Sequence, residues 1–499
     1  MTEGRGVAGS LAVCTLLALA PALLLVLQVM LTVPGFVYSL DDPYIHLALG
    51  RQILQGHYGL NPGEFSAPAS SIFWPFLLAP FASTRIAEAV PLVIDLAALT
   101  VTLWWIGRWL ETYMTRAWAL SATVVLALCL NLYGLPITGM EHSVQVMFAA
   151  IVVLSLVQDR ILWPFWVSVL LLPFIRYEGL ALSLPTLAFL FLTGRHRAAT
   201  VIASIAILAG VAGFSAFLYA HSGNPMPASI MAKQGLTFAD RLPTFHSIAV
   251  NVRAQLFFCV IAAFAGFLYL REGKLLLAVL LVAVPTIGQM IFGQYGSMER
   301  YQIYFDMWIG ALFVGAYMRS TLPRSTVLNI LLLAGLAWGS RGTIPNQLVT
   351  SLASRNNHDQ QDQMATIAGR YLAEPVAAND IGLIAFRAKV YVLDLWGLAS
   401  YEALRLRGGR HPETWMEDLM RRHKVEHAFF YDTWFGEHPA SWIRVATLTL
   451  PAPSVVAGGS QVSLYSTNPE AAARLRAALT AYRQSSLQAA MMLTLTPLS

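Results

Sequence analysis

The sequence has little charge for its length. Lys, Arg, Asp and Glu make up 12% of its 499 residues, whereas 57% are hydrophobic, and the mean hydropathy is +0.59. A soluble globular chain carries about twice that charged fraction, so the composition excludes an ordinary soluble protein. The net charge of +5 is small and indicates cytoplasmic loops and lipid contact rather than nucleic-acid binding. We expect a polytopic membrane protein.

Cysteine is also scarce. Cys14, Cys129 and Cys259 all lie in apolar runs, where they form neither a metal-binding spacing nor an evident set of disulfides. A cleaved signal peptide is not expected, because the first apolar stretch is long and no small-residue cleavage site precedes the acidic pair that follows it.

Apolar segments predict eleven membrane-spanning helices, since a span needs about 20 mostly apolar residues. We place them at residues 10–32, 86–107, 117–135, 142–158, 161–175, 177–193, 198–220, 253–270, 275–293, 301–318 and 326–342. A further apolar segment, 72–81, is too short to span and contains two prolines. We interpret it as interfacial or re-entrant.

Positive charge predicts the orientation of these spans, because cytoplasmic loops are rich in Lys and Arg. With the N-terminus inside, nearly every inside turn is basic, and an odd number of spans leaves the C-terminal region outside. The same orientation brings the unusual polar clusters to the outer face. These are residues 41–42, 139–142, 176–178, 224–233 and 299–300.

The C-terminal region changes character at about residue 351, where long apolar runs end and charge returns. Residues 390–395 and 427–431 are typical of strands, and 471–488 are typical of a helix. The predicted organisation is therefore a membrane bundle over 1–343, with a first outer loop at 33–85, followed by an outer α/β domain over 344–499. Residues 491–499 are expected to form a loose tail, and no internal repeat is evident.

Asp41 and Asp42 stand side by side where the first span ends. Adjacent carboxylates at a membrane boundary are costly, so they indicate either a solvated loop or an active site. Pro43 can open a short helix, in which case capping would explain one aspartate but not the pair. Tyr44 and His46 follow in the same loop, and residues 61–63 form a turn signal before Glu64.

Four later segments carry polar side chains that are expected on the outer face. Each has a structural alternative: Arg176 and Glu178 could be snorkelling charges, Lys233 a solvated surface charge, and Glu299 with Arg300 an ion pair at a helix end. Functionally, Arg176 offers a forked donor set for a phosphate. Glu141 and His142 open a span beside the same face.

Taken in order, these segments resemble polyprenyl-phosphate-sugar-dependent glycosyltransferases of the GT-C fold, in particular the bacterial terminal arabinofuranosyltransferase-like group. The resemblance covers most of the chain. The matching segments are 41–45, 61–64, 139–141, 176–179, 227–233, Arg300, 379–382 and 394–398. The chain departs from the pattern at 293–296, where the family often has Gly-Gly-Asp-Trp, and at Tyr177, where proline is common.

The resemblance implies that a sugar moves from a polyprenyl-phosphate donor to a hydroxyl of a cell-envelope glycan, lipid or protein. The sugar would be arabinofuranose-like or a hexose, and direct displacement would invert the anomeric centre. Asp41 is favoured as the base, with Asp42 orienting it, holding a cation or exchanging roles with it. Arg176, Lys233 and Arg300 would meet the phosphate. Residues lining the pocket would be Tyr44, His46, Glu64, Glu141, His142, Glu178 and Glu299.

A divalent cation at Asp41 and Asp42 is compatible with these carboxylates, since Mg²⁺ and Ca²⁺ prefer oxygen ligands, but the sequence does not require one. A bacterial inner membrane with the site on the periplasmic side is the expected location. Two rival functions remain. A transporter or flippase of lipid-linked sugars would need polar residues at the membrane midplane, where Asp95 is the clearest example. A scaffold would leave the aspartate pair and Arg176 without a task.

Overall fold

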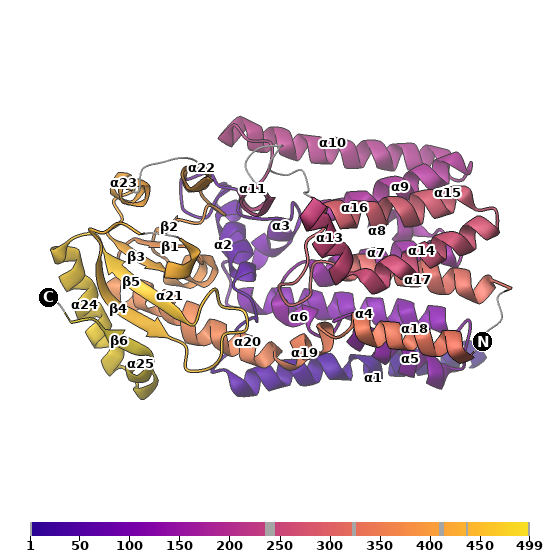
Figure 1. Cartoon of the computed structure of the whole chain (residues 1–499), viewed down its shortest axis with the longest axis horizontal. Helices are drawn as coiled ribbons and strands as arrows, with labels where there is room; N and C mark the ends of the chain where they lie inside the picture. Colours follow the sequence, from indigo (N-terminus) through magenta and orange to yellow (C-terminus); the bar gives the residue numbers. More distant parts are fainter. Residues whose placement is uncertain (1, 235–244, 322–325, 409–413, 436–437, 498–499) are drawn as a thin grey trace. The chain divides into compact units, whose positions relative to one another are not determined.

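A computed structural model describes residues 2–234, 245–321, 326–408, 414–435 and 438–497 (Figure 1). The chain forms two compact units. The helical unit comprises residues 1–27, 91–213 and 243–349, and the mixed unit comprises 28–90, 214–242 and 350–499. The first outer loop thus belongs to the same unit as the C-terminal region, an association that the sequence analysis did not anticipate.

Helices, most of them apolar, make up the helical unit. In chain order they are α1 (Thr2–Thr32), α4 (Val90–Leu110), α5 (Arg116–Cys129), α6 (Leu135–Thr138), α7 (His142–Val157), α8 (Trp163–Ile175), α9 (Leu180–Leu192), α10 (Arg197–Ser222), α13 (Phe245–Ala254), α14 (Leu256–Arg271), α15 (Leu275–Leu277), α16 (Val284–Phe292), α17 (Ile303–Arg319), α18 (Thr326–Gly339) and α19 (Thr343–Leu348). The ends of α1, α4 and α10 extend beyond the unit.

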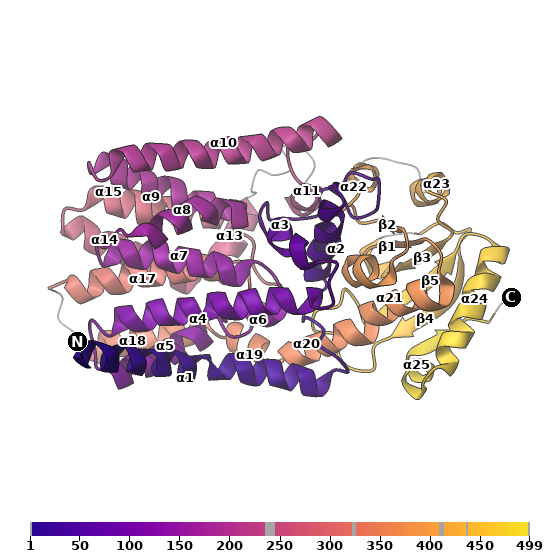
Figure 2. The same cartoon turned by 180° about the vertical axis from the view of Figure 1, so that it is seen from behind.

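Helix α7 lies at the centre of this unit, packed against α8 and α17, and α14 packs on α17 (Figures 1 and 2). It is buried on nearly all sides, as expected for a helix that is hydrophobic all round. Trp308 and Phe165 are fully buried in the same core. Within the described residues, four helices are long and apolar enough to cross a membrane, or five with one bent pair. Eleven spans therefore stays a prediction.

The mixed unit combines short helices with a sheet. Its helices include α2 (Asp42–Leu54), α3 (Trp74–Leu78), α11 (Ala228–Gln234), α20 (Thr350–Asn357), α21 (Gln363–Thr366), α22 (Tyr401–Gly408), α23 (Trp415–Arg422), α24 (Pro469–Gln484) and α25 (Leu487–Met492). Its strands are β1 (Val376–Ala378), β2 (Val392–Asp394), β3 (His427–Phe430), β4 (Ile443–Thr449), β5 (Gln461–Ser466) and β6 (Leu493–Leu495).

The sheet has the strand order β2-β1-β3-β5-β4-β6. Strands β2, β1 and β3 are parallel, and the remaining pairings are antiparallel. Helix α24 packs on β4 and β5 (Figure 1). Because β1, β2 and β3 run the same way, their carboxyl ends meet at one edge, where ligands commonly bind in open sheets.

Several local predictions agree with the observed elements. Strands β2 and β3 and helix α24 lie in the segments predicted at 390–395, 427–431 and 471–488, although α24 begins at Pro469 and already ends at Gln484. Segment 72–81 holds only α3 and one further turn, which is too short to span a membrane. The expected loose tail at 491–499 is wrong in part, because Leu493–Leu495 form β6 and pair with β4.

Candidate functional site: a carboxylate site and an arginine cluster

Helix α2 begins at the acidic pair. Asp42 is its first residue, Pro43 follows in the first turn, where a missing N–H costs nothing, and Asp41 precedes the helix. The Asp41 side chain makes no capping hydrogen bond with α2. Capping therefore does not explain Asp41, and its carboxylate is available for another partner.

That partner is the backbone that follows β1. Asp41 Oδ1 accepts a hydrogen bond from Leu383 N at 2.8 Å, and Asp41 Oδ2 accepts one from Gly382 N. The side chain is buried, whereas the neighbouring Asp42 is half-buried. Asp41 is thus fixed in place through both oxygens, and Asp42 is the more accessible carboxylate of the pair.

Asp380 completes what we call the carboxylate site, formed by Asp41, Asp42 and Asp380. It lies just beyond β1, at the edge where the parallel strands end, and it hydrogen-bonds with Asp41. Gln361 Nε2 donates to Asp380 Oδ2 at 2.8 Å and also lies 2.7 Å from the Tyr431 hydroxyl. The carboxylate is thereby held by neutral partners rather than by a cation.

Burial and the negative charge of a neighbouring aspartate raise the pKa of both buried carboxyls. Burial raises the pKa of Asp41, and the negative charge of Asp380 raises it further, against the two backbone N–H groups. Burial likewise raises the pKa of Asp380, with a further contribution from the charge of Asp42. Two carboxylates that share a site cannot both ionise easily. Asp41 and Asp380 therefore hold a proton between them more tightly than ordinary aspartates.

Residues predicted to line the pocket around Asp41 take structural positions in the mixed unit. Tyr44 is fully buried, with the Arg387 guanidinium 5.5 Å from its ring, and His46 is buried in α2. Glu64 is exposed and accepts a hydrogen bond from the Tyr391 hydroxyl at 2.9 Å. Glu64 therefore belongs to a surface contact with the C-terminal region.

A second group, which we call the arginine cluster, lies in the helical unit. Its members are Arg176, Glu141, Glu178, Tyr301, Arg300 and His142. Arg176 follows α8 in an extended conformation, because Tyr177 to Gly179 begin a new turn. Its Nη1 lies 2.8 Å from Glu141 Oε1, and its Nη2 lies 2.8 Å from Glu178 Oε1. Arg176 and Glu141 are both buried.

An aromatic ring joins the remaining members of the arginine cluster. The guanidinium of Arg176 lies 5.3 Å from the Tyr301 ring, and that of Arg300 lies 4.8 Å from it. Arg300 Nη2 also donates to the Tyr301 hydroxyl at 2.8 Å, and His142 packs edge-on against the same ring. Two cations thus flank one tyrosine. Glu299 accepts a hydrogen bond from Gln302.

The sequence grouped Arg176, Arg300, Glu141, His142 and Glu178 as neighbours of one site, and the structure brings these five together. Asp41 and Asp42 belong to the mixed unit instead. Lys233 also belongs to the mixed unit, in α11, but its side chain lies outside what the structure describes. Helix α11 packs on α22, where the Tyr401 hydroxyl donates to Met226 O at 3.0 Å.

A metal ion does not fit the carboxylate site readily. Within the described residues, no three His, Cys, Asp or Glu side chains are grouped so that they could hold one. Both oxygens of Asp41 already accept backbone hydrogen bonds, so Asp41 has little left to offer a cation. The divalent cation suggested by the sequence remains a prediction.

Sequence reasoning noted the segment 379–382 as a strand and turn but missed Asp380 as a site residue. The local signal was present: an acidic residue stands two positions after a short apolar strand and two positions before a glycine. In a parallel sheet, that position lies at the edge where ligands bind.

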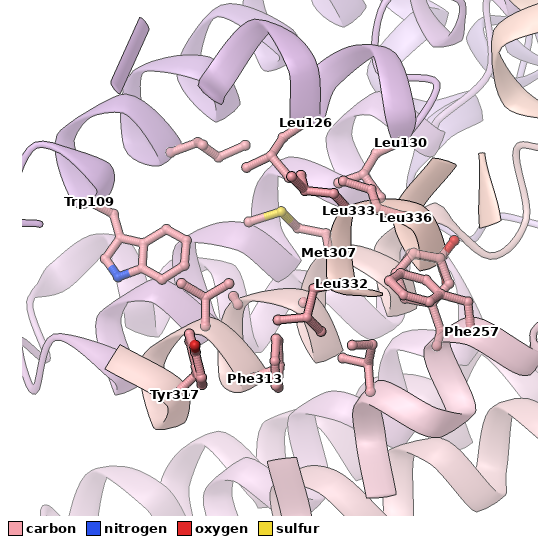
Figure 3. A pocket seen from close by; sticks show the side chains of 17 residues that line it. Trp109, Leu126, Leu130, Phe257, Met307, Phe313, Tyr317, Leu332, Leu333 and Leu336 are labelled. Carbon is pink, nitrogen blue, oxygen red and sulfur yellow. The ribbon is translucent and has the colours of Figure 1, made fainter. Parts of the chain in front are cut away.

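An apolar cavity of about 230 Å³ lies in the helical unit. Figure 3 shows side chains of Trp109, Leu126, Met307, Phe313 and Leu333 around it. Asp306, which is buried in the first turn of α17, is the one acidic residue that lines this cavity. The cavity can hold a hydrocarbon chain but offers few polar groups.

Comparison with known proteins gives limited matches. Residues 350–465 match a family described as "Domain of unknown function (DUF8728)". No curated protein matches the sequence. The crystal structure of the Archaeoglobus fulgidus oligosaccharyltransferase in the apo form is similar with a TM-score of 0.45 and 12% identity, over 95% of this chain and 78% of that one. At this level of similarity, residue roles have to come from the chain's own geometry.

Proposed function

We propose that this chain is a membrane glycosyltransferase that moves a sugar from a polyprenyl-phosphate donor to a hydroxyl of a cell-envelope glycan, lipid or protein. The sugar is an arabinofuranose-like or hexose unit, and transfer takes place on the outer face of the membrane. The observation that carries the proposal is the carboxylate site, where a half-buried Asp42 stands beside an Asp41 that the backbone of Gly382 and Leu383 holds in place.

The two aspartates have different tasks in this proposal. Asp42 is the general base, because it is the more accessible of the pair and a base must reach the acceptor hydroxyl. Asp41, which the backbone N–H groups of Gly382 and Leu383 fix in place, positions the start of the helix that carries Asp42. Sequence reasoning favoured Asp41 as the base, with exchanged roles as the alternative. The hydrogen bonds to both Asp41 oxygens favour that alternative.

The reaction balances as a single displacement. Asp42 takes the proton of the acceptor hydroxyl while the acceptor oxygen forms a bond to the anomeric carbon. The bond from that carbon to the phosphate oxygen breaks, and the polyprenyl phosphate leaves with the electron pair. Attack opposite the leaving group inverts the anomeric centre.

Cations are required where the phosphate leaves, because negative charge develops there. Arg176, Arg300 and Lys233 are the proposed phosphate-binding residues. Arg176 and Arg300 already flank Tyr301, and the buried Glu141 and the half-buried Glu178 hold the Arg176 fork in one orientation. The donor's isoprenoid chain is proposed to lie in the apolar cavity of the helical unit.

Transfer itself is the direct test. Purified protein in detergent would be offered a panel of radiolabelled polyprenyl-phosphate sugars together with acceptor glycans. Release of polyprenyl phosphate together with labelled product supports the proposal and names the sugar. Absence of transfer with every donor and acceptor contradicts it.

Substitution of the carboxylates assigns their roles. Asp42→Asn should abolish transfer and leave the unfolding temperature unchanged, because an amide cannot accept the proton. Asp41→Asn should also lower stability, since an amide nitrogen cannot accept the hydrogen bond that one of the Asp41 oxygens receives. Asp380→Asn should lower the pKa of the Asp41 carboxyl, because the charge of Asp380 raises it. Normal turnover of Asp42→Asn would remove it as the base.

A transporter of lipid-linked sugars is the second candidate. Asp95 and Asp306 favour it, because both are carboxylates buried within apolar helices, where ionisable residues often mark a translocation path. Reconstituted vesicles separate the two functions. Movement of a labelled lipid-linked sugar between leaflets without chemical transfer would support the transporter.

A further inference from the structure

A polar pocket of about 760 Å³ lies within the mixed unit, between the C-terminal end of α2 and the segment that follows β1. The residues that line it include Arg51, Gln52, Asn61, Phe386, Lys389 and Tyr391. No acidic residue lines it. The pocket is therefore positively charged as well as polar.

Its two cations are available to a ligand. Arg51 Nη2 donates to Phe386 O at 3.0 Å, and its guanidinium lies 4.5 Å from the Phe386 ring. This contact orients the side chain and uses one of its five N–H groups. Lys389 is exposed. Across the described residues, neither Arg51 nor Lys389 forms an ion pair with a carboxylate. The charge of Glu88 acts on Arg51 from beyond ion-pair distance, and Glu88 is itself paired with Arg387. The pocket therefore presents two cations that no ion pair neutralises.

Gln52 supplies an independent observation. Its side chain lines the pocket and is only 7% exposed, and its Oε1 has no hydrogen-bond partner among the described residues. A buried acceptor without a partner is costly. Rotation about the soft terminal torsion would present this oxygen to a hydroxyl of a ligand.

Asn61 shows the contrast with Gln52. Its Nδ2 donates to Val392 O at 2.9 Å, and its Oδ1 accepts from Val392 N at 3.0 Å. The amide of Asn61 thus anchors the first outer loop to β2. Asn61 therefore shapes the pocket wall, whereas the Oε1 of Gln52 can accept a hydrogen bond from a ligand.

From this combination we propose that the pocket binds an acidic saccharide, that is, a glycan bearing carboxylate or phosphate groups. The anion would pair with Arg51 and Lys389, and a sugar hydroxyl would donate to Gln52 Oε1. The half-buried Tyr391 ring at the pocket wall would pack against the apolar face of a sugar. A neutral glycan would leave both cations unpaired.

Helix α2 contributes residues both to the pocket and to the carboxylate site. Asp42 and Arg51 lie on the same helix, nine residues apart, which corresponds to about 14 Å along the helix axis. If the carboxylate site transfers a sugar as proposed, the pocket would hold the acceptor chain. That assignment rests on the proposed function, whereas the binding of an acidic saccharide does not.

Binding of a defined pair of saccharides tests the inference. Isothermal titration calorimetry on the full chain in detergent would compare an oligogalacturonate with its methyl ester, which carries a methyl group in place of each negative charge. We expect the charged form to bind at least about tenfold more tightly, with an affinity that falls as salt rises. Equal affinities for the two forms would overturn the proposal.

Matched lysine variants locate the site. Lys389→Asn should weaken binding of the oligogalacturonate several-fold. Lys424→Asn is the control, because Lys424 is also exposed, has nearly the same backbone φ (55° against 56°) and does not line the pocket. Arg51→Gln should weaken binding further if its unfolding temperature shows that it folds. Equal affinity of the Lys389 and Lys424 variants would move the site elsewhere.

An anionic lipid headgroup is the competing source of the same chemistry. Short-chain phosphatidylglycerol would be titrated against the bound oligogalacturonate. Failure to displace it supports a glycan site, whereas displacement combined with weak oligogalacturonate binding identifies a lipid site and overturns the proposal. The binding experiments contain no sugar donor, so their outcome does not depend on the proposed function. Absence of transfer together with normal binding of the oligogalacturonate would contradict the proposed function and leave this inference standing.

Discussion

The carboxylate of Asp41 accepts a hydrogen bond from the backbone N–H of Gly382, a residue 341 positions further along the chain. The next residue, Leu383, donates to the other oxygen at 2.8 Å. The aspartate that ends the first apolar run is therefore held by the segment following β1. The first outer loop and the C-terminal region build the carboxylate site jointly, so neither part would contain it alone.

Gly382→Ala should disrupt this contact. A Cβ at position 382 would lie 2.1 Å from the carbonyl oxygen of Asp41 and 2.6 Å from its Oδ2, so the backbone would have to move. A shift of about 1 Å at a catalytic group costs on the order of 100-fold in rate. Turnover with the lipid donor and the unfolding temperature measure the effect.

The control for this prediction is Gly213→Ala, because a Cβ at Gly213 would meet nothing within 4 Å. That variant should turn over normally. Normal turnover of both alanine variants would show that the Asp41 contact with the C-terminal region has no part in transfer.

A structural feature of this chain could be predicted where the sequence pattern that encodes it lies within one segment. Apolar runs and alternating patterns lie within each segment, so strands β2 and β3 and helix α24 could be predicted from the sequence. The partners of Asp41 could not, since no pattern near residue 41 encodes Gly382. The same holds for Arg176 and Glu141, which lie 35 positions apart. Their common location on the outer face was predicted, but their ion pair was not.

Strand β6 likewise could not be predicted from the sequence around it. Residues 493–495 are too few to carry an alternating pattern of their own, and they form a strand because β4 offers an unpaired edge. Edge pairing is a tertiary effect. A short terminal segment of this kind looks like a tail in the sequence alone.

Asp394 should make stability depend on pH. It accepts hydrogen bonds from the backbone N–H groups of Trp396 and Gly397 at 2.8 and 3.0 Å. Burial nevertheless raises the pKa of its carboxyl to about 6. Because the folded pKa exceeds the unfolded one, this contribution to stability is fully present below about pH 4 and is lost as the pH rises through about 6. The loss amounts to about 3 kcal/mol.

Asp394→Asn removes this titration. Unfolding temperatures of the full chain between pH 4 and pH 7 should therefore fall less steeply for the variant than for the native protein. Asp418→Asn serves as the control, since the Asp418 side chain is 45% exposed. Identical slopes for native protein and Asp394→Asn would mean that burial of Asp394 does not govern this pH range.

Arg176→Gln should be strongly destabilising. The substitution leaves Glu141 buried without its cation, and breaking a buried ion pair on one side costs about 3–5 kcal/mol. Adding Glu141→Gln should recover most of that stability, because no uncompensated charge then stays buried at that position. Thermal unfolding of the two single variants and the double variant measures the coupling.

The double variant also separates structure from function at the arginine cluster. If Arg176 contacts the donor phosphate, the double variant, although stable, should still turn over about ten- to a hundredfold more slowly than the native protein, because one charge-assisted contact is missing. Recovery of full turnover together with stability would confine Arg176 to a structural ion pair.

Gly310→Leu should affect stability and donor use in opposite directions. Gly310 lies in α17 and lines the apolar cavity, where a Cβ would meet nothing within 4 Å. Replacing a helical glycine gains up to about 1 kcal/mol of helix propensity, so the unfolding temperature should rise. The leucine side chain fills part of a cavity of about 230 Å³, so a long isoprenoid chain should bind less well. We expect KM to rise for a full-length polyprenyl donor and to change little for a short-chain analogue.

The control for this prediction is Gly213→Leu, at a similarly open position, which should leave both KM values unchanged. A donor affinity that is independent of chain length in Gly310→Leu would place the lipid chain outside this cavity.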